Sequence, residues 1–155
     1  MDAAVWQRTF LVNTTGYALT TKYALPHLKA AGGGTIINIS SMGGHYMGTP
    51  EPIRVAYAAS KAAVHALSRH TAATYGPDNV RCNTVALGPI LTAALERGIS
   101  AASPAMQEGL KRVPLRRLGK LEEVGALLAF MISPDAAYIT GDIWSIDGGT
   151  HVMTY

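Results

Sequence analysis

Two side chains that can exchange a proton with a substrate, Tyr57 and Lys61, stand four residues apart in the sequence. On a helix, this spacing puts both side chains on one face. An ordinary phenol has a pKa of about 10 and is a poor acid or base at neutral pH, but an ammonium group one turn away stabilises its anion. Such a tyrosine can protonate a carbonyl oxygen or deprotonate an alcohol. The pattern alone is weak evidence, because most such pairs are ordinary surface neighbours.

Two serines, Ser40 and Ser41, end a short β-branched stretch that precedes the tyrosine in the chain. Open α/β sheets hold their ligands at the carboxyl ends of strands. A serine hydroxyl placed there can bind the substrate oxygen and stabilise the charge that develops on it. The alternative is that the two serines only begin a turn. The residues themselves leave both interpretations open.

The segments that position these residues alternate between helices and buried strands. Apolar residues at helical spacing predict a helix over residues 5–31, which three glycines at 32–34 end. Continuous β-branched runs predict strands over residues 35–41, 80–87 and 143–147. Further helices are expected over residues 55–75 and 121–132. The pattern predicts a single α/β domain over residues 1–155, with about three strands in a parallel sheet and flanking helices.

Composition narrows the classes of function. Of the 155 residues, 48% are hydrophobic and 15% are charged, so the chain can bury a core. The basic residues are scattered and no aromatic residues alternate with them, which argues against a nucleic-acid partner. No apolar run is long enough to span a bilayer and no signal peptide is recognised, so we expect a cytoplasmic protein without a membrane partner. Cys82 lies in an apolar run and is expected to be a buried thiol. The histidines lack metal-ligand grouping, so no metal site is expected.

Several ordered blocks resemble the short-chain dehydrogenase/reductase family over nearly the whole chain. The block from Asn38 to Ser41 resembles the family's serine-bearing strand end, and Tyr57-Ala58-Ala59-Ser60-Lys61 resembles its YxxxK helix. Val12-Asn13, followed by Gly16 and Leu25-Pro26, resembles the helix before that strand. The resemblance implies a catalytic set in which Asn13 anchors a water-linked proton relay to the lysine. The four members of this set are Asn13, Ser41, Tyr57 and Lys61.

A second group of blocks resembles the family's cofactor turn and C-terminal segment. Gly88-Pro89-Ile90-Leu91-Thr92 matches the turn, and Ile146-Asp147-Gly148-Gly149 matches the segment. The resemblance implies that a nicotinamide cofactor, NAD or NADP, is held by Gly88, by the Ile90 backbone and by the Thr92 hydroxyl, together with Tyr57 and Lys61. Leu87 departs from the proline that the family usually has before this turn.

The Gly-rich βαβ unit that binds the pyrophosphate in this family has no counterpart in these residues. The only Gly-rich string, at 32–34, ends a helix and precedes a strand, which is the reverse order. We therefore expect the C-terminal half of a doubly wound Rossmann-type sheet, with about a hundred residues and the adenosine part of the cofactor site missing.

The resemblance implies an NAD(P)-dependent oxidoreductase that moves hydride between nicotinamide and a secondary alcohol or ketone, as 3-oxoacyl-carrier-protein reductases do. Met106, Leu110 and Val113 suggest a mainly apolar substrate. His45, in a Gly- and Pro-rich loop, either contacts the substrate or is a solvated loop histidine, and the second is favoured. The alternative function is an inactive fragment that serves as an assembly module, since the family forms dimers and tetramers through its helices and last strand. A homo-oligomer is expected in either case.

Overall fold

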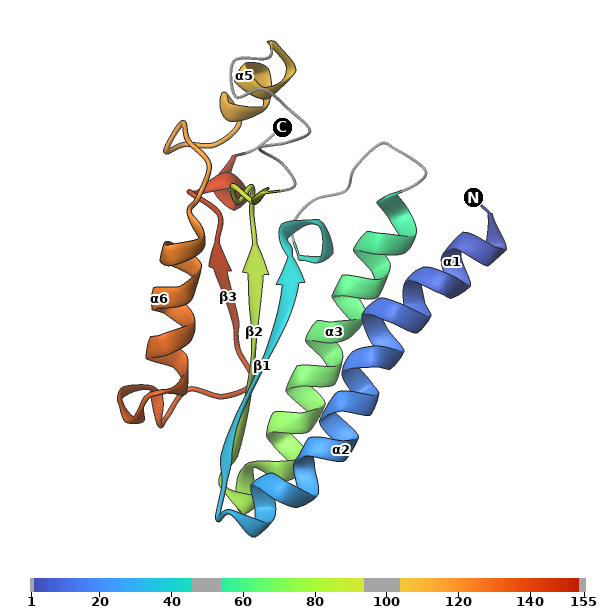
Figure 1. Cartoon of the computed structure of the whole chain (residues 1–155), viewed down its shortest axis with the longest axis vertical. Helices are drawn as coiled ribbons and strands as arrows, with labels where there is room; N and C mark the ends of the chain where they lie inside the picture. Colours follow the sequence, from blue (N-terminus) through green and yellow to red (C-terminus); the bar gives the residue numbers. More distant parts are fainter. Residues whose placement is uncertain (1, 46–53, 94–103, 154–155) are drawn as a thin grey trace.

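Three parallel strands form the sheet at the centre of the fold (Figure 1). The computed structural model describes residues 2–45, 54–93 and 104–153. The strands are β1 (Gly34–Ser41), β2 (Val80–Leu87) and β3 (Ile143–Ile146), in the order β1-β2-β3. Ser41 pairs with Leu87, and Leu87 pairs with Ile146, so the three carboxyl ends meet at one edge of the sheet. The predicted parallel α/β sheet is confirmed, although the last strand ends one residue earlier than expected.

The first helical segment contains an interruption that the sequence pattern did not predict. Helix α1 (Ala3–Phe10) continues through a π-helical turn (Leu11–Thr15) into α2 (Gly16–Ala30). The prediction of one regular helix over residues 5–31 is therefore wrong in the middle. In the π turn each hydrogen bond joins residues five apart instead of four, which interrupts the α-helical spacing. The glycines end the helix as predicted, since Gly32 and Gly33 adopt φ angles of 81° and 130°.

Helices cover both faces of the sheet, which makes three layers (Figure 1). Helices α2 and α3 (Arg54–Tyr75) lie on one face, and α6 (Leu121–Ile132) lies on the other. The short helix α5 (Pro104–Leu110) stands beyond the carboxyl ends of the strands. Helices on both faces with parallel crossovers define part of a doubly wound sheet, as predicted.

The core between the sheet and α3 is partly polar. Val64 and Val85 are fully buried, but so are hydroxyl and amide groups that bond one another. Asn38 Nδ2 donates to Ser68 Oγ over 2.8 Å, and Thr84 Oγ1 lies 2.8 Å from the same oxygen. This network ties β1, β2 and α3 together beneath the carboxyl ends of the strands. Cys82 is buried as predicted, and burial raises the pKa of its thiol to about 11.

The two strands with the longest ladder differ in how completely they are buried. In β2, six of the eight residues are buried, whereas β1 has two buried residues and six of intermediate exposure. The difference follows from position, since β2 has a strand on each side and β1 has a neighbour on one side within the described sheet. Among the described residues, β2 is therefore the strand neighbour of β1, and the outer edge of β1 has none.

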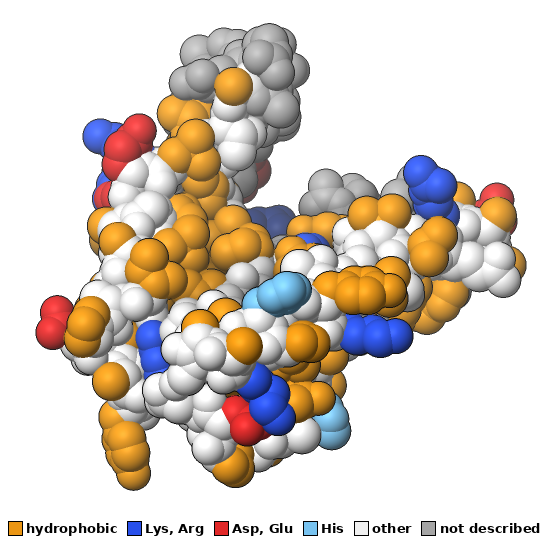
Figure 2. Space-filling model, turned by 60° about the horizontal axis from the view of Figure 1, so that its bottom comes forward, with side chains coloured by type: hydrophobic (Ala, Val, Ile, Leu, Met, Phe, Trp, Pro, Cys, Tyr) orange, Lys and Arg blue, Asp and Glu red, His pale blue; other side chains and the backbone are white. Residues whose placement is uncertain are grey.

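The surface carries hydrophobic and charged groups side by side. On the face shown in Figure 2, Lys and Arg side chains stand in separate small groups among hydrophobic and uncharged atoms. None of the helices in the described part of the chain combines the length and apolar character needed to cross a membrane.

Candidate active site

Lys61 lies at the meeting point of β1 and α3. Its side chain crosses from the helix to the strand, where Nζ donates a hydrogen bond of 3.0 Å to the carbonyl oxygen of Ile39. The residue is buried, with 8% of its surface exposed, and burial lowers the pKa of the ammonium group. A cation held in this way beneath the strand end has little freedom to move, so its charge acts at a fixed place.

Tyr57 stands one helical turn before Lys61, at the open end of α3. Lys61 Nζ lies 5.9 Å from the centroid of the Tyr57 ring, so the two side chains share a face as the spacing predicts. Tyr57 is 41% exposed while Lys61 is buried. The arrangement therefore exposes the Tyr57 side chain while the Lys61 side chain next to it is buried.

Ser41 is the last residue of β1, the strand whose Ile39 oxygen accepts the hydrogen bond from Lys61. Its hydroxyl oxygen accepts a 3.2 Å hydrogen bond from the amide of Gly43 and begins a short turn, Met42–Gly44. The turn packs on α3 so closely that a Cβ on Gly44 would lie 2.7 Å from Lys61 Cβ. Ser41 therefore begins a turn, which is the alternative that the sequence left open. The same turn packs against α3 at Lys61.

Asn13 approaches the pair from the π-helical turn between α1 and α2. Its Nδ2 donates to Ser60 Oγ over 3.1 Å, and Ser60 Oγ in turn donates to the backbone oxygen of Tyr57 over 2.7 Å. Asn13 thus bonds the residue before Lys61, whereas the resemblance implies a link through water to the lysine itself. Thr14 Oγ1 bonds the backbone oxygen of Ser60 as well, over 3.2 Å. The π turn is what aims two successive side chains at α3.

Tyr17 belongs to this cluster, although the sequence patterns did not single it out. Its hydroxyl donates to the Ile39 oxygen over 2.8 Å, the same oxygen that Lys61 uses, and its ring centroid lies 5.1 Å from Lys61 Nζ. Burial, followed by the proximity of Tyr57, raises the pKa of Tyr17 and keeps its proton in place. The sequence pattern that could have identified Tyr17 is its position four residues after Asn13, a spacing that puts two side chains on one side of a helix.

A buried serine–histidine pair stands behind the site. Ser40 Oγ and His65 Nε2 are 2.6 Å apart, and each residue is 3% exposed. Burial, then the charges of His45, Arg69 and Lys61, lower the pKa of His65 to about 4, so the ring is neutral at pH 7. His45 is half-buried with its ring edge-on to His65 at 5.2 Å, which corrects the expectation of a solvated loop histidine.

The predicted cofactor turn follows β2 and is fixed by glycines. A Cβ on Gly88 would lie 2.5 Å from Asp147 Cβ, so only glycine lets the end of β2 lie this close to the end of β3. Ile90 pairs with Gly119, and the amide of Gly119 donates to the Pro89 oxygen over 3.0 Å. Thr92 is exposed. Because Ser41 pairs with Leu87, the residue before the turn, the turn lies at the same edge of the sheet as Ser41.

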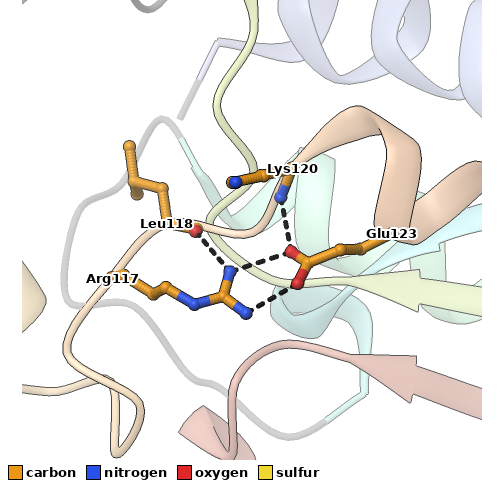
Figure 3. Close-up of polar contacts among 4 residues, drawn as sticks. All are labelled: Arg117, Leu118, Lys120 and Glu123. Atoms are coloured by element: carbon orange, nitrogen blue, oxygen red, sulfur yellow. Dashed lines mark hydrogen bonds and ion pairs between the residues drawn. The ribbon is translucent and has the colours of Figure 1, made fainter.

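Beside this turn, an ion pair fixes the start of α6 (Figure 3). Arg117 donates to both carboxylate oxygens of Glu123, over 2.9 and 2.6 Å, and the Lys120 amide donates to the same carboxylate over 2.8 Å. The bond from Arg117 is the main reason that the pKa of Glu123 falls to about 2. Both residues line a hollow of about 130 Å³ together with Ile90. The ion pair thereby supports the segment that holds the turn.

The residues expected to line an apolar substrate pocket have a mixed outcome. Val113 is only 2% exposed, and it packs so closely on Gly148 that a Cβ there would lie 2.8 Å from the Val113 side chain. Val113 therefore belongs to the core. Leu110 is half-buried at the end of α5, and the side chain of Met106 lies outside the described residues, as do residues 46–53 of the predicted loop. Within residues 2–45, 54–93 and 104–153, no three His, Cys, Asp or Glu side chains gather in a group that could hold a metal ion.

Comparisons with known proteins show to which family the chain belongs. A family described as enoyl-(acyl carrier protein) reductase matches residues 1–151. A probable short-chain type dehydrogenase/reductase from Bradyrhizobium diazoefficiens is 43% identical over 100% of this chain. A cis-4-hydroxycyclohexanecarboxylate dehydrogenase from Sinomonas cyclohexanicum is 38% identical over 96% of it. The chain therefore belongs to the short-chain dehydrogenase/reductase family.

Solved structures of the family superpose on nearly the whole chain. A short-chain type dehydrogenase/reductase from Mycobacterium ulcerans covers 97% of it with a TM-score of 0.88 and 28% identity. A 7α-hydroxysteroid dehydrogenase complexed with NADH and 7-oxo glycochenodeoxycholic acid covers 96% with a TM-score of 0.85 and 31% identity. In the other direction, this chain spans about half of each: 54% of the Bradyrhizobium relative, 57% of the Sinomonas relative, and 54% and 56% of the two solved chains.

Proposed function

We infer that this chain carries the proton-transferring half of an NAD(P)-dependent oxidoreductase that acts on a secondary alcohol or ketone. The observation that carries the proposal is the arrangement of Tyr57 and Lys61, in which an exposed phenol stands over a buried ammonium group at the carboxyl end of β1. An isolated surface pair would not place the lysine beneath the strand with its amine bonded to a backbone oxygen, as Lys61 is.

In the proposed reaction, Tyr57 exchanges a proton with the substrate oxygen while hydride moves to or from the carbon. Lys61 favours the phenolate form through its charge, and the hydrogen bond from its amine to the carbonyl oxygen of Ile39 keeps it in place. Ser41 uses its hydroxyl hydrogen to bind the substrate oxygen, because its oxygen already accepts from Gly43. Asn13 positions the helix turn of Tyr57 and Lys61 through Ser60.

The cofactor proposed for the site is NAD or NADP, which supplies or accepts the hydride when it is bound. The residues present fit its nicotinamide end, because the turn of Gly88, Ile90 and Thr92 lies at the same edge of the sheet as Ser41. Two of the similar solved proteins were studied as complexes with NADH. Groups for the pyrophosphate and adenosine lie outside these residues, so the proposal extends to the nicotinamide half alone.

Association with other copies in the cytoplasm is part of the proposal. Large hydrophobic side chains are exposed on α1–α2 and on the segment from α6 to β3, among them Leu19, Tyr23, Ile132 and Tyr138. Burying such side chains at an interface removes apolar surface from water. A dimer or tetramer is therefore expected.

The proposal is tested in a chimera in which these 155 residues replace the aligned part of the Bradyrhizobium relative, so that the fold is complete. Oxidation of a panel of secondary alcohols with NAD⁺ and with NADP⁺ is followed by the absorbance of the reduced nicotinamide. Lys61→Met should lower kcat by about 10²-fold or more, whereas Lys22→Met, at an exposed site on α2, should not. A chimera that is folded and binds NADH but turns over no alcohol or ketone would contradict the proposal.

A further inference from the structure

We propose that His65, acting through the hydroxyl of Ser40, is a positioning residue that holds Lys61 against the end of β1. The proposal rests on the proposed function, because the charge of Lys61 supports Tyr57 there. It deepens that function by giving a task to a buried pair that takes no direct part in the proposed reaction. The hydrogen bonds that carry the proposal can be examined without turnover.

Two hydrogen bonds join Lys61 to successive residues of β1 in opposite directions. Lys61 Nζ donates to the Ile39 oxygen over 3.0 Å, and the backbone oxygen of Lys61 accepts from Ser40 Oγ over 3.2 Å. The first bond holds the ammonium end of the side chain, and the second holds the backbone from which the side chain starts. Because both ends are tied to the same strand, the place of the ammonium group depends on both bonds.

The hydroxyl of Ser40 can satisfy both of its contacts only if His65 supplies a hydrogen. A serine hydroxyl has one hydrogen to donate, and a backbone oxygen can only accept. The hydrogen of Ser40 therefore points to Lys61, and the 2.6 Å contact between Ser40 Oγ and His65 Nε2 needs a hydrogen on the nitrogen. A pKa of about 4 makes the ring neutral at pH 7, so it bears its one hydrogen on Nε2. In the other tautomer, Ser40 would give its hydrogen to His65, and the oxygens of Ser40 and Lys61 would face each other without one.

The surroundings of His65 leave its ring little room to turn. The residue is 3% exposed, and the ring of His45 packs edge-on against it with the centroids 5.2 Å apart. His45 ends the turn after β1, and this turn packs closely on Lys61 through Gly44. The link from His65 to Lys61 is thus enclosed between the helix, the strand and the turn. Without the donor on His65, the Ser40 hydroxyl is free to turn away from Lys61.

The first test determines the tautomer of His65 in the 155-residue chain itself. In a chain labelled with ¹⁵N at histidine, the ¹⁵N chemical shifts of the two ring nitrogens distinguish a nitrogen that bears a hydrogen from one that does not. The signals of His65 are assigned by their absence from the spectrum of His65→Gln. At neutral pH we expect the hydrogen on Nε2. A hydrogen on Nδ1 with none on Nε2 overturns the proposal, whatever the activity of the chimera.

The second test uses the chimera and follows kcat for a secondary alcohol as a function of pH. In the proposed reaction, alcohol oxidation needs the phenolate of Tyr57, so kcat rises with pH to a plateau. His65→Met removes the donor but keeps a side chain of similar size, and Ser40→Ala removes the hydroxyl. His65→Gln keeps an N–H group near the place of Nε2 and should rescue the link. Ser68→Ala is the matched control, because Ser68 is also a buried serine between α3 and β1, where its hydroxyl accepts from Asn38.

We expect the midpoint of the kcat profile to move to higher pH by about one unit in His65→Met and in Ser40→Ala, because a displaced ammonium group stabilises the phenolate less. The double variant should show no further movement, since both changes break one link. His65→Gln and Ser68→Ala should keep the midpoint of the unaltered chimera, although Ser68→Ala should lower Tm.

The outcomes separate this role of His65 from the proposed function. An active chimera in which His65→Met and Ser40→Ala keep the midpoint, or in which their effects add, overturns the role and leaves the proposed function standing. An equal movement in Ser68→Ala also overturns it, because any loss of core hydrogen bonding would then suffice. An unaltered chimera that turns over no alcohol or ketone contradicts the proposed function, and the role of His65 falls with it.

Discussion

Replacing His65 by glutamine should remove a pH-dependent part of the free energy of unfolding. The ring of His65 is 3% exposed, and its Nε2 lies 2.6 Å from Ser40 Oγ. Burial is the main cause of its lowered pKa of about 4, and the nearby charges of His45, Arg69 and Lys61 act in the same direction. Glutamine is uncharged, and its amide nitrogen can occupy a place close to that of Nε2.

The sign and size of the effect follow from proton binding. An unfolded histidine has a pKa of about 6.5, so below that pH the unfolded chain binds a proton that the folded chain does not accept until the pH falls to about 4. The stability from the neutral ring is complete above pH 6.5 and is lost as the pH falls toward 4. Between pH 8 and pH 5 the loss amounts to about 2 kcal/mol.

Urea denaturation of the chain at both pH values measures this loss. The loss of stability between pH 8 and pH 5 should be about 2 kcal/mol larger for the unaltered chain than for His65→Gln. His70→Gln is the control, because His70 is exposed on the same helix and its ring nitrogen lies within hydrogen-bond distance of Thr74. If His65→Gln and the unaltered chain lose the same stability, the buried neutral histidine does not exist in solution and this part of the reasoning is refuted.

Four other substitutions test separate parts of the structure by thermal unfolding. Arg116 adopts a φ of 54°, so Arg116→Gly should relieve about 1 kcal/mol of backbone strain and raise Tm by about 2–4 °C; an unchanged or lower Tm would contradict this. Gly88→Ala should cost about 1–3 kcal/mol because its Cβ would overlap Asp147, whereas Gly125→Ala, with no atom within 4 Å of its Cβ, should stabilise α6; equal effects would argue against the close approach of β2 and β3. Glu123→Gln should lower Tm by breaking the ion pair with Arg117, and the difference should shrink in high salt; since the pKa of Glu123 is about 2, it should persist at pH 4 and disappear only in stronger acid.

The sequence predicted the elements with strong local patterns. The β-branched run at Val80–Leu87 and the apolar helix at Leu121–Ile132 have the predicted bounds, because a continuous buried strand and a well-ended helix leave local signs in the residues themselves. The four-residue spacing of Tyr57 and Lys61 likewise gave their shared face. Each of these features depends on residues close together in the chain, which is the information that periodicity contains.

Features that depend on tertiary contacts could not be predicted from patterns in the sequence. The π-helical turn at Leu11–Thr15 has no sign in apolar spacing, since its side chains are positioned by bonds to Ser60 on another helix. The burial of His65 depends on Ser40 in a strand 25 residues away. The apolar side chain of Val113 suggested a lining for the substrate, but the glycine at 148 lets Val113 pack into the core. In each case a distant partner decides the environment of the side chain.

In the proposed reaction, Tyr57, supported by Lys61, transfers the proton that accompanies hydride transfer. This role of Tyr57 is tested most directly by measuring kcat for a secondary alcohol in the chimera described above, for the unaltered sequence, Tyr57→Phe and Tyr138→Phe, the last being a fully exposed tyrosine outside the site. We expect Tyr57→Phe to lower kcat by about 10²–10⁴-fold and Tyr138→Phe to leave kcat unchanged. Turnover by Tyr57→Phe at the rate of the unaltered chimera would contradict it.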